Sequence, residues 1–163
     1  MDETEATDRL LLAVLPNVPF DGWSVAALRA GARSLELPES EAKALFPRDG
    51  AALVACFSHW ADRAMLERIA DDAFAQLKTG QRVAAAVRTR LDILEPHREA
   101  ARRGLTVLAL PQNAALGLRL LYDTVDAIWY AAGDTATDFN FYTKRGLLAG
   151  VYAATVLYWI NDR

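Results

Sequence analysis

The residue types that most often carry catalysis are few in this chain, and their spacing keeps them apart. His59 and His97 are its two histidines, and neither stands in a Glu-x-x-His or His-x-x-x-His pattern, which would place metal ligands on one helix face. Ser58 and His59 are adjacent, so on a helix their side chains point about 100° apart and form no nucleophile–base pair. We therefore expect neither a catalytic site nor a metal site.

Acidic and thiol groups give no stronger indication of chemistry. Asp71 and Asp72 are neighbours, and neighbours on a helix face different directions, so we interpret them as solvated side chains. Cys56 lies inside an apolar stripe, where a small buried thiol is much commoner than a reactive one. The sequence contains no glycine-rich phosphate loop. These residues predict a protein that is not an enzyme and that uses no cofactor.

The stretch from Asp138 to Arg145 combines aromatic and charged residues, the types that dominate recognition patches. Two interpretations are open. Asp138 suits the positive end of a helix dipole and Phe139 can pack inward, which would make the stretch an ordinary helix start. Lys144 and Arg145, however, lie beyond the first turn, which favours contact with a partner.

Composition indicates one domain in a reducing compartment. The chain has 163 residues, of which 53% are hydrophobic, enough for a single core. Its formal net charge is -3, so nucleic acid is a poor default partner. A single cysteine and the acidic opening MDETEATDR argue against a disulfide and a basic leader, and we expect a cytoplasmic protein. Abundant alanine and arginine are typical of a GC-rich bacterial genome.

Apolar residues recur at helical spacing almost throughout, which predicts an all-α fold of about eight helices. Ser24 is expected to cap the second helix, and Gly133 to end the seventh. The expected helices span 5–15, 25–35, 38–47, 49–77, 83–94, 97–110, 113–133 and 138–160. This is one TetR-like domain over 1–163, in which three short helices (1–47) precede a bundle of long ones (48–163).

Two of the long helices carry particular expectations. In 49–77 the apolar stripe runs through Phe57 and Trp60, and Asp62 falls outside it. The uncharged run from Gly146 to Ile160 is too short to cross a bilayer, which takes about 20 residues, so we interpret it as a buried helix. An alternative is contact with a membrane surface, because Tyr158 and Trp159 are residue types found at the lipid–water interface.

The helix order also resembles that of TetR-type repressors, so the second and third helices were tested as a helix-turn-helix. From Ser24 to Gly50 four basic residues are balanced by four acidic ones, whereas a DNA reader shows excess positive charge. Glu39 and Glu41 open the expected recognition helix, where they would repel phosphates. We expect a retained scaffold without DNA binding. The alternative is a TetR-type transcriptional regulator with an apolar ligand pocket.

A longer segment identifies a family. The runs LALPQN and LLYDTVDAIWYAAGDTATDFNFYTKRGLLAGVYAATVLYW, between Leu105 and Trp159, resemble the lipid-binding accessory proteins of ubiquinone biosynthesis, the TetR-like partners of the di-iron demethoxyubiquinone hydroxylase. The most specific element, GDTATDFNFYTKR, matches the family pattern Gly-Asp-x-Ser/Thr-x-Asp-Phe-Asn-Trp-Tyr-Thr-Lys/Arg-Arg at nearly every position. Before Leu105 the resemblance rests mostly on helix order.

The resemblance implies that the protein holds an isoprenoid quinone precursor or a phospholipid and presents the precursor to the hydroxylase, without catalysing a reaction. It implies a position at the cytoplasmic surface of the inner membrane. The family's partner-facing patch maps onto Asp138, Asn140, Phe141, Tyr142, Lys144 and Arg145.

The sequence departs from the family in two places. Phe141 replaces the usual tryptophan, which keeps an aromatic body and loses the indole N–H. Family members usually continue beyond the final helix into an amphipathic helix that covers the lipid site, whereas the present sequence ends at Arg163. Where that helix is missing, apolar surface is exposed, and we expect a homodimer or bound lipid.

The helices after residue 90 have wide apolar faces and few polar groups, which suit a lipid tail better than a polar metabolite. The candidate lining residues are Leu94, Leu105, Leu108, Leu121, Val125, Trp129, Tyr152 and Leu157. Each of them is equally compatible with ordinary core packing.

Overall fold

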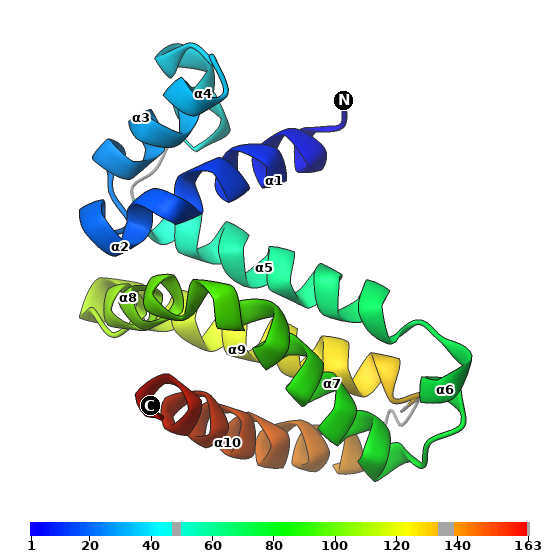
Figure 1. The fold of residues 1–163 in the computed structure, drawn as a ribbon. Coiled ribbons are helices and arrows are strands. Elements are labelled where there is room, and N and C mark those ends of the chain that lie inside the picture. Colours follow the sequence, from blue (N-terminus) through cyan, green and yellow to red (C-terminus); the bar gives the residue numbers. More distant parts are fainter. Residues whose placement is uncertain (47–49, 134–138, 163) are drawn as a thin grey trace. The chain divides into compact units, whose positions relative to one another are not determined.

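The computed structural model describes residues 1–46, 50–133 and 139–162, without the side chains of Phe139 and Phe141. The regular structure of these residues is helical (Figure 1), which confirms the all-α prediction. The α-helices are α1 (Glu3–Val14), α2 (Val18–Asp21), α3 (Val25–Ser34), α4 (Glu39–Leu45), α5 (Gly50–Ile69), α6 (Asp72–Ala75), α7 (Thr79–Leu94), α8 (Arg98–Leu108), α9 (Ala114–Ala131) and α10 (Phe139–Asn161).

Helix ends follow local sequence signals. The Ser24 hydroxyl accepts a hydrogen bond from the Ala27 N–H at 3.2 Å, which confirms the expected cap of α3. Gly133, just beyond α9, has a φ of 82°, a backbone conformation that glycine adopts without steric cost. The sequence Thr135-Ala-Thr-Asp138 also has the spacing of a capping box for the last helix, but these residues lie outside the described ones.

The expected helix 49–77 is interrupted, and the prediction was wrong there. Helix α5 ends at Ile69, and Asp71 takes an extended backbone conformation that starts α6. The Asp71 carboxylate accepts a hydrogen bond from the Phe74 N–H at 2.7 Å. Aspartate favours this capping position because it satisfies an amide that has no partner inside the helix. Asp71 is therefore a helix cap rather than a merely solvated side chain.

The chain divides into two compact units. The first contains Met1–Trp60 and His97–Gly117, and the second contains Ala61–Pro96 and Leu118–Arg163. The N-terminal region 1–47 belongs entirely to the first unit. Among the described residues no single helix has both the length and the apolarity to cross a membrane, although the bent pair 79–108 and 111–131 passes by length and composition together.

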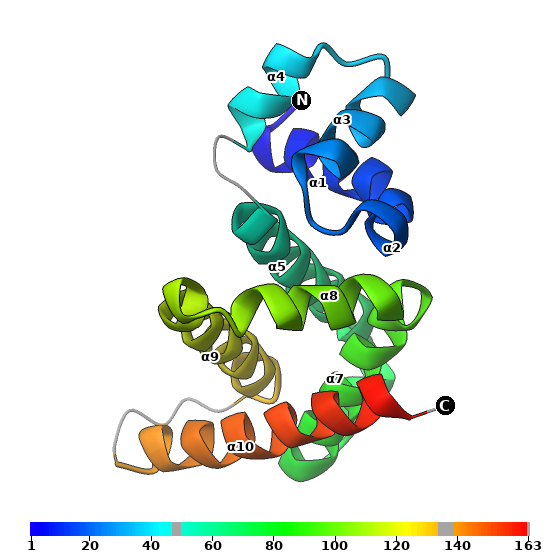
Figure 2. The ribbon, with the colours of Figure 1, turned by 90° about the vertical axis from the view of Figure 1, so that its left-hand side faces the viewer.

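In the first unit, α1 and α4 both pack on α3 (Figures 1 and 2). The crossing of α1 and α3 is close because Gly31 has no side chain. A Cβ at this position would lie 2.6 Å from Cγ2 of Val14. A side chain there would force the two helices apart, so Gly31 fixes their spacing.

An aromatic cluster forms the other part of the first unit. Trp23 is buried, its indole N–H donates to the Ala100 carbonyl at 2.9 Å, and its ring lies 5.3 Å from that of Phe57. The His97 ring meets Phe57 and Trp60 edge-on, at centroid distances of 6.1 and 5.9 Å. The cluster ties α5 and the start of α8 to the segment before α3.

The position of His97 predicts a pH dependence of stability. Partial burial lowers the pKa of His97 below its ordinary value of 6.5, so the unfolded chain binds a proton more readily than the folded one. The contribution of neutral, partly buried His97 to the free energy of unfolding is complete above pH 6.5. It is lost as the pH falls from 6.5 toward the lower pKa of the folded state. Urea unfolding between pH 5 and 8 should show this loss. His97→Gln should lack it and His59→Gln should keep it; equal profiles for all three proteins would contradict the prediction.

Candidate functional site

The structure places the predicted lipid-lining residues in both units. Leu105 and Leu108, which are partly buried, belong to the first unit. The other six belong to the second unit, where Leu94, Val125 and Tyr152 are buried, Leu121 and Trp129 are partly buried, and Leu157 is exposed. Six of the eight candidate lining residues therefore belong to the second unit.

The second unit also buries a polar cluster that the sequence reading missed. Asp62, Arg90, Thr124 and Tyr152 come from α5, α7, α9 and α10. The Arg90 Nε–H donates to the Asp62 carboxylate at 2.7 Å, and the Thr124 hydroxyl donates to the same oxygen at 2.8 Å. A second guanidinium N–H of Arg90 donates to the Tyr152 hydroxyl. The cluster links the four longest helices of this unit, α5, α7, α9 and α10, through one buried charge pair.

The electrostatics of the cluster favour the ion pair. Burial by itself lowers the pKa of Arg90, but its electrostatic interactions and hydrogen bonds with Tyr152 and Asp62 outweigh burial and hold the pKa above its ordinary value. Burial raises the pKa of Tyr152, so its hydroxyl stays neutral. Asp62 was expected outside the apolar stripe of its helix and is buried instead. The sequence did contain a sign of this buried charge pair on α7. Arg90 stands four residues from both Ala86 and Leu94, so it lies on the apolar face of that helix.

Two buried donors near the C-terminal end of α9 have no hydrogen-bond partner in the described structure: the indole N–H of Trp129 and the Nε–H of Arg82. They lie in one region, because another N–H of Arg82 donates to the carbonyl of Ala132, one helical turn after Trp129, at 3.2 Å. The Lys144 ammonium lies 5.7 Å from the centre of the Trp129 ring. Buried donors normally find an acceptor, and for these two none lies among the described residues.

The residues of the predicted partner patch differ in how far they are exposed to solvent. Asp138 and the side chain of Phe141 lie outside the described residues. Asn140 and Tyr142 are exposed, and Lys144 is partly buried over Trp129. The side chain of Arg145 is only 6% exposed, and its Nε–H donates to the Asp126 carboxylate at 3.0 Å. Arg145 therefore holds α10 against α9, and among the described side chains of the patch Tyr142 is the large one that solvent reaches.

The outer face of α10 is apolar and exposed, which the sequence reading also missed. Leu147, Val151 and Tyr158 are 67%, 62% and 74% exposed, and they follow one another at helical spacing. A Cβ at Gly146 or Gly150 would meet no atom within 4 Å. The helix predicted to be buried is thus covered on one face alone. An exposed apolar face of this length is typical of surfaces that contact another molecule.

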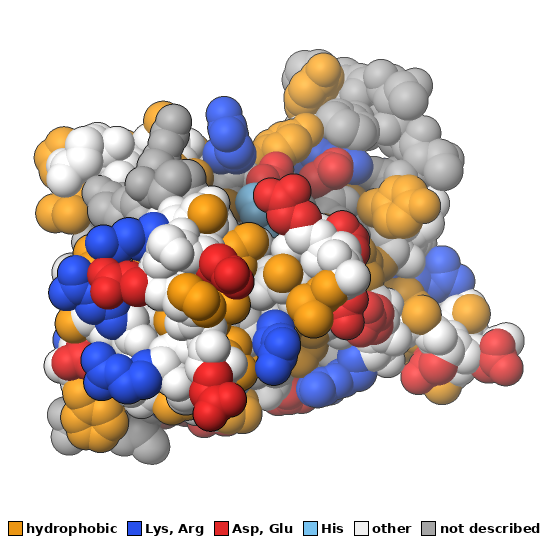
Figure 3. Space-filling view, turned by 90° about the horizontal axis from the view of Figure 1, so that it is seen from above, with side chains coloured by type: hydrophobic (Ala, Val, Ile, Leu, Met, Phe, Trp, Pro, Cys, Tyr) orange, Lys and Arg blue, Asp and Glu red, His pale blue; other side chains and the backbone are white. Residues whose placement is uncertain are grey.

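Neither a metal centre nor a basic surface emerges from the described part of the chain. Among those residues no group of three or more His, Cys, Asp or Glu side chains is placed to hold a metal ion. On the face in Figure 3, Lys and Arg side chains alternate with Asp and Glu. On α4, Glu39 is paired with Arg29 and Lys43 at 2.7 and 3.0 Å. This arrangement does not offer the positive field that binds a phosphate backbone.

The family model and the curated relatives that match this chain carry the same family name. The family model described as COQ9 matches residues 114–163. The mitochondrial ubiquinone biosynthesis protein COQ9 of Rattus norvegicus is 40% identical over 98% of this chain and 53% of its own length, and that of Homo sapiens is 38% identical over 98% and 52%. The Drosophila melanogaster protein is 32% identical over 95% and 48%. The chain spans about half the length of these curated relatives.

A solved structure supports the predicted fold. The chain superposes on the crystal structure of a TetR transcriptional regulator from Nitrosomonas europaea with a TM-score of 0.78, covering 98% of this chain and 87% of that one. The two sequences are 17% identical, so the likeness concerns the fold alone. It confirms the TetR-like architecture expected from the helix order.

Proposed function

Because the chain belongs to the COQ9 family, we propose that it is a non-catalytic accessory protein of ubiquinone biosynthesis, which holds a lipid and presents an isoprenoid quinone precursor to the demethoxyubiquinone hydroxylase. The observation that carries the assignment to ubiquinone biosynthesis is the 40% identity to the rat protein across 98% of the chain. We also propose that it works at the inner-membrane surface, where molecules with isoprenoid tails reside.

The interior of the second unit supports the lipid-holding part of the proposal. Its candidate lining is apolar at Leu94, Leu121 and Val125. The buried N–H groups of Trp129 and Arg82 lie at one end and have no acceptor in the described structure. A lipid with an oxygen at its polar end would satisfy both requirements, since its tail meets apolar side chains and its oxygen accepts from the indole.

Lipid extraction tests this part. Organic extraction of the purified chain followed by mass spectrometry should yield a phospholipid or an isoprenoid in near-stoichiometric amount. Trp129→Phe keeps the ring and removes the indole N–H, so it should lower retention about fivefold, the effect of one hydrogen bond of about 1 kcal/mol. Tyr130→Phe removes a hydroxyl from the exposed neighbour and is the matched control. An empty extract from a natively folded preparation would contradict lipid holding.

The partner-binding part rests on α10. Tyr142 lies in the family motif and is exposed at the start of α10, and Leu147 and Val151 are exposed further along the same helix on another face. Exposed aromatic side chains beside flat apolar surface are typical centres of protein interfaces. The hydroxylase is the partner that the family motif suggests, and a second copy of the chain is the alternative occupant of the same face.

A further inference from the structure

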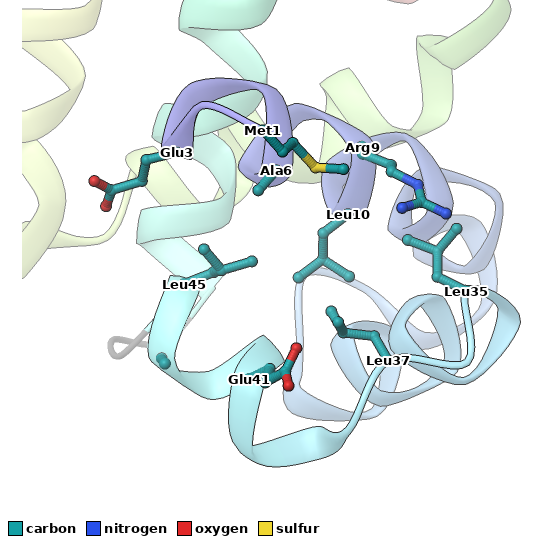
Figure 4. Close-up of a pocket in the computed structure, with 10 residues that line it drawn as sticks. Met1, Glu3, Ala6, Arg9, Leu10, Leu35, Leu37, Glu41 and Leu45 are labelled. Carbon is teal, nitrogen blue, oxygen red and sulfur yellow. The ribbon is translucent and has the colours of Figure 1, made fainter.

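The first unit contains an apolar groove that no part of the proposed function uses. Its volume is about 510 Å³, and it lies between α1 and α4 (Figure 4). Ala6 and Leu10 line it from α1, Ala44 and Leu45 from α4, and Leu35 and Leu37 from the link between α3 and α4. In Figure 4 the side chains of Leu10, Leu37 and Leu45 point toward one another across the groove.

The groove exists because α1 and α4 both pack on α3. The link before α4 contains Glu36 with a φ of 54° and then Pro38, which forms the start of the helix. Leu35, Leu37 and Leu45 remain only half-buried as a result. Burying the exposed part of these leucines is favourable, so the hydrophobic effect would stabilise an apolar occupant in the groove.

The two walls have the geometry that receives a helix. Glu3, Ala6 and Leu10 follow one another on one face of α1, and Glu41 and Leu45 are four residues apart on α4. Two helical ridges with a floor between them accept the apolar stripe of a third helix, as in helix-in-groove recognition.

The rim of the groove selects the charge of the occupant. Met1–Arg9 and Glu36–Leu45 together contain seven acidic and two basic residues, and the charged side chains that line the groove itself are Glu3, Glu41 and Arg9. Glu39 is already paired with Arg29 and Lys43, whereas Glu3 and Glu41 line the groove itself. Arg9 lies at the end opposite Glu3 (Figure 4). A positively charged occupant is therefore favoured.

We propose that this groove binds a basic amphipathic helix of a partner protein, with the apolar stripe of that helix on Leu10, Leu37 and Leu45 and its basic residues beside Glu3 and Glu41. Arg9 lies at the groove as a like charge and weakens the binding of basic residues at its end. The proposal is independent of lipid holding and of the face of α10, since it concerns other residues in the first unit.

The test uses an end-capped peptide of about 14 residues, made of leucine and lysine, with leucine at the i, i+3, i+4 and i+7 positions. Titration into the whole chain at low salt, followed by fluorescence anisotropy and amide chemical shifts, should give saturable binding with shifts at Leu37 and Leu45. Glu3→Gln and Glu41→Gln should each weaken binding about threefold, and Arg9→Gln should strengthen it about twofold. Glu67→Gln, an exposed change outside the groove, should leave it unchanged.

Three results would overturn the proposal. One is equal binding of a scrambled peptide of the same composition, which would show attraction without helix recognition. Another is equal binding of the peptide with glutamate in place of lysine. The third is no saturable binding, or shifts confined to residues outside the groove. All of the substitutions replace exposed charged side chains, so the variants should fold, and circular dichroism verifies this.

Discussion

Arg90→Leu is expected to lower the free energy of unfolding by about 3–5 kcal/mol, because it leaves the Asp62 carboxylate buried without its counter-charge. The side chains of Arg90 and Asp62 are 6% and 10% exposed, so water cannot take over the lost contact. The Thr124 hydroxyl, which also donates to that carboxylate, would remain and carries no compensating charge. Urea denaturation of the wild-type and variant chains measures the difference.

The double variant Asp62→Leu, Arg90→Leu separates the effect of an unpaired buried charge on stability from the effect of altered packing. Removing both charges removes the cost of an uncompensated carboxylate, so the double variant should be more stable than Arg90→Leu alone. Arg88→Leu, an exposed change on the same helix, should alter stability by less than about 0.5 kcal/mol. If Arg90→Leu and Arg88→Leu destabilise the chain equally, the buried cluster does not hold the second unit together.

The proposed partnership with the demethoxyubiquinone hydroxylase predicts that Tyr142→Ala weakens binding at least tenfold, a loss of about 1.4 kcal/mol or more. Tyr142 is 70% exposed at the start of α10 and is the large solvent-accessible side chain of the motif. Truncating it removes an aromatic anchor and leaves the fold unchanged, since the side chain contributes little to the core. Surface plasmon resonance with the hydroxylase of the same organism measures the effect.

The control for this prediction is Phe20→Ala, which removes an aromatic side chain that is 85% exposed on α2 in the first unit. It should leave hydroxylase binding unchanged. Leu147→Ala and Val151→Ala test the exposed apolar face further along α10, and losses in these variants would add that face to the interface. Unchanged binding in Tyr142→Ala would exclude the patch as the hydroxylase interface. If the wild-type chain dimerises with increasing concentration and the same variants do not, the face instead binds a second copy of the chain.

Much of the local structure could be predicted from residue types. Ser24 caps α3 and Gly133 follows α9, because hydroxyl caps and positive-φ glycines act through their own backbone and need no tertiary contact. The break at Asp71 was missed because the apolar pattern continues through Phe74 and Leu77, which hides a local cap. Periodicity reports which residues share a face and does not report where a helix stops.

Burial of charge could not be predicted in the same way. Asp62 and Arg90 are 28 residues apart, and their pairing arises only when α5 and α7 come together. Arg145 was expected to face a partner and instead pairs with Asp126 of α9. A charged side chain looks the same in sequence whether it meets solvent or a counter-charge, so its environment depends on which helices pack against it.

The sequence alone determined the all-α class, the likeness to the ubiquinone accessory family, and the absence of a recognisable catalytic or metal-binding pattern, because each of these depends on residue type and spacing. Tertiary packing alone decided that one face of α10 stays exposed, that four helices share a buried ion pair, and that α1 and α4 leave an acid-rimmed groove. The physical reason is that apolar faces find their partners only in three dimensions, where the same leucine can be core, lining or surface.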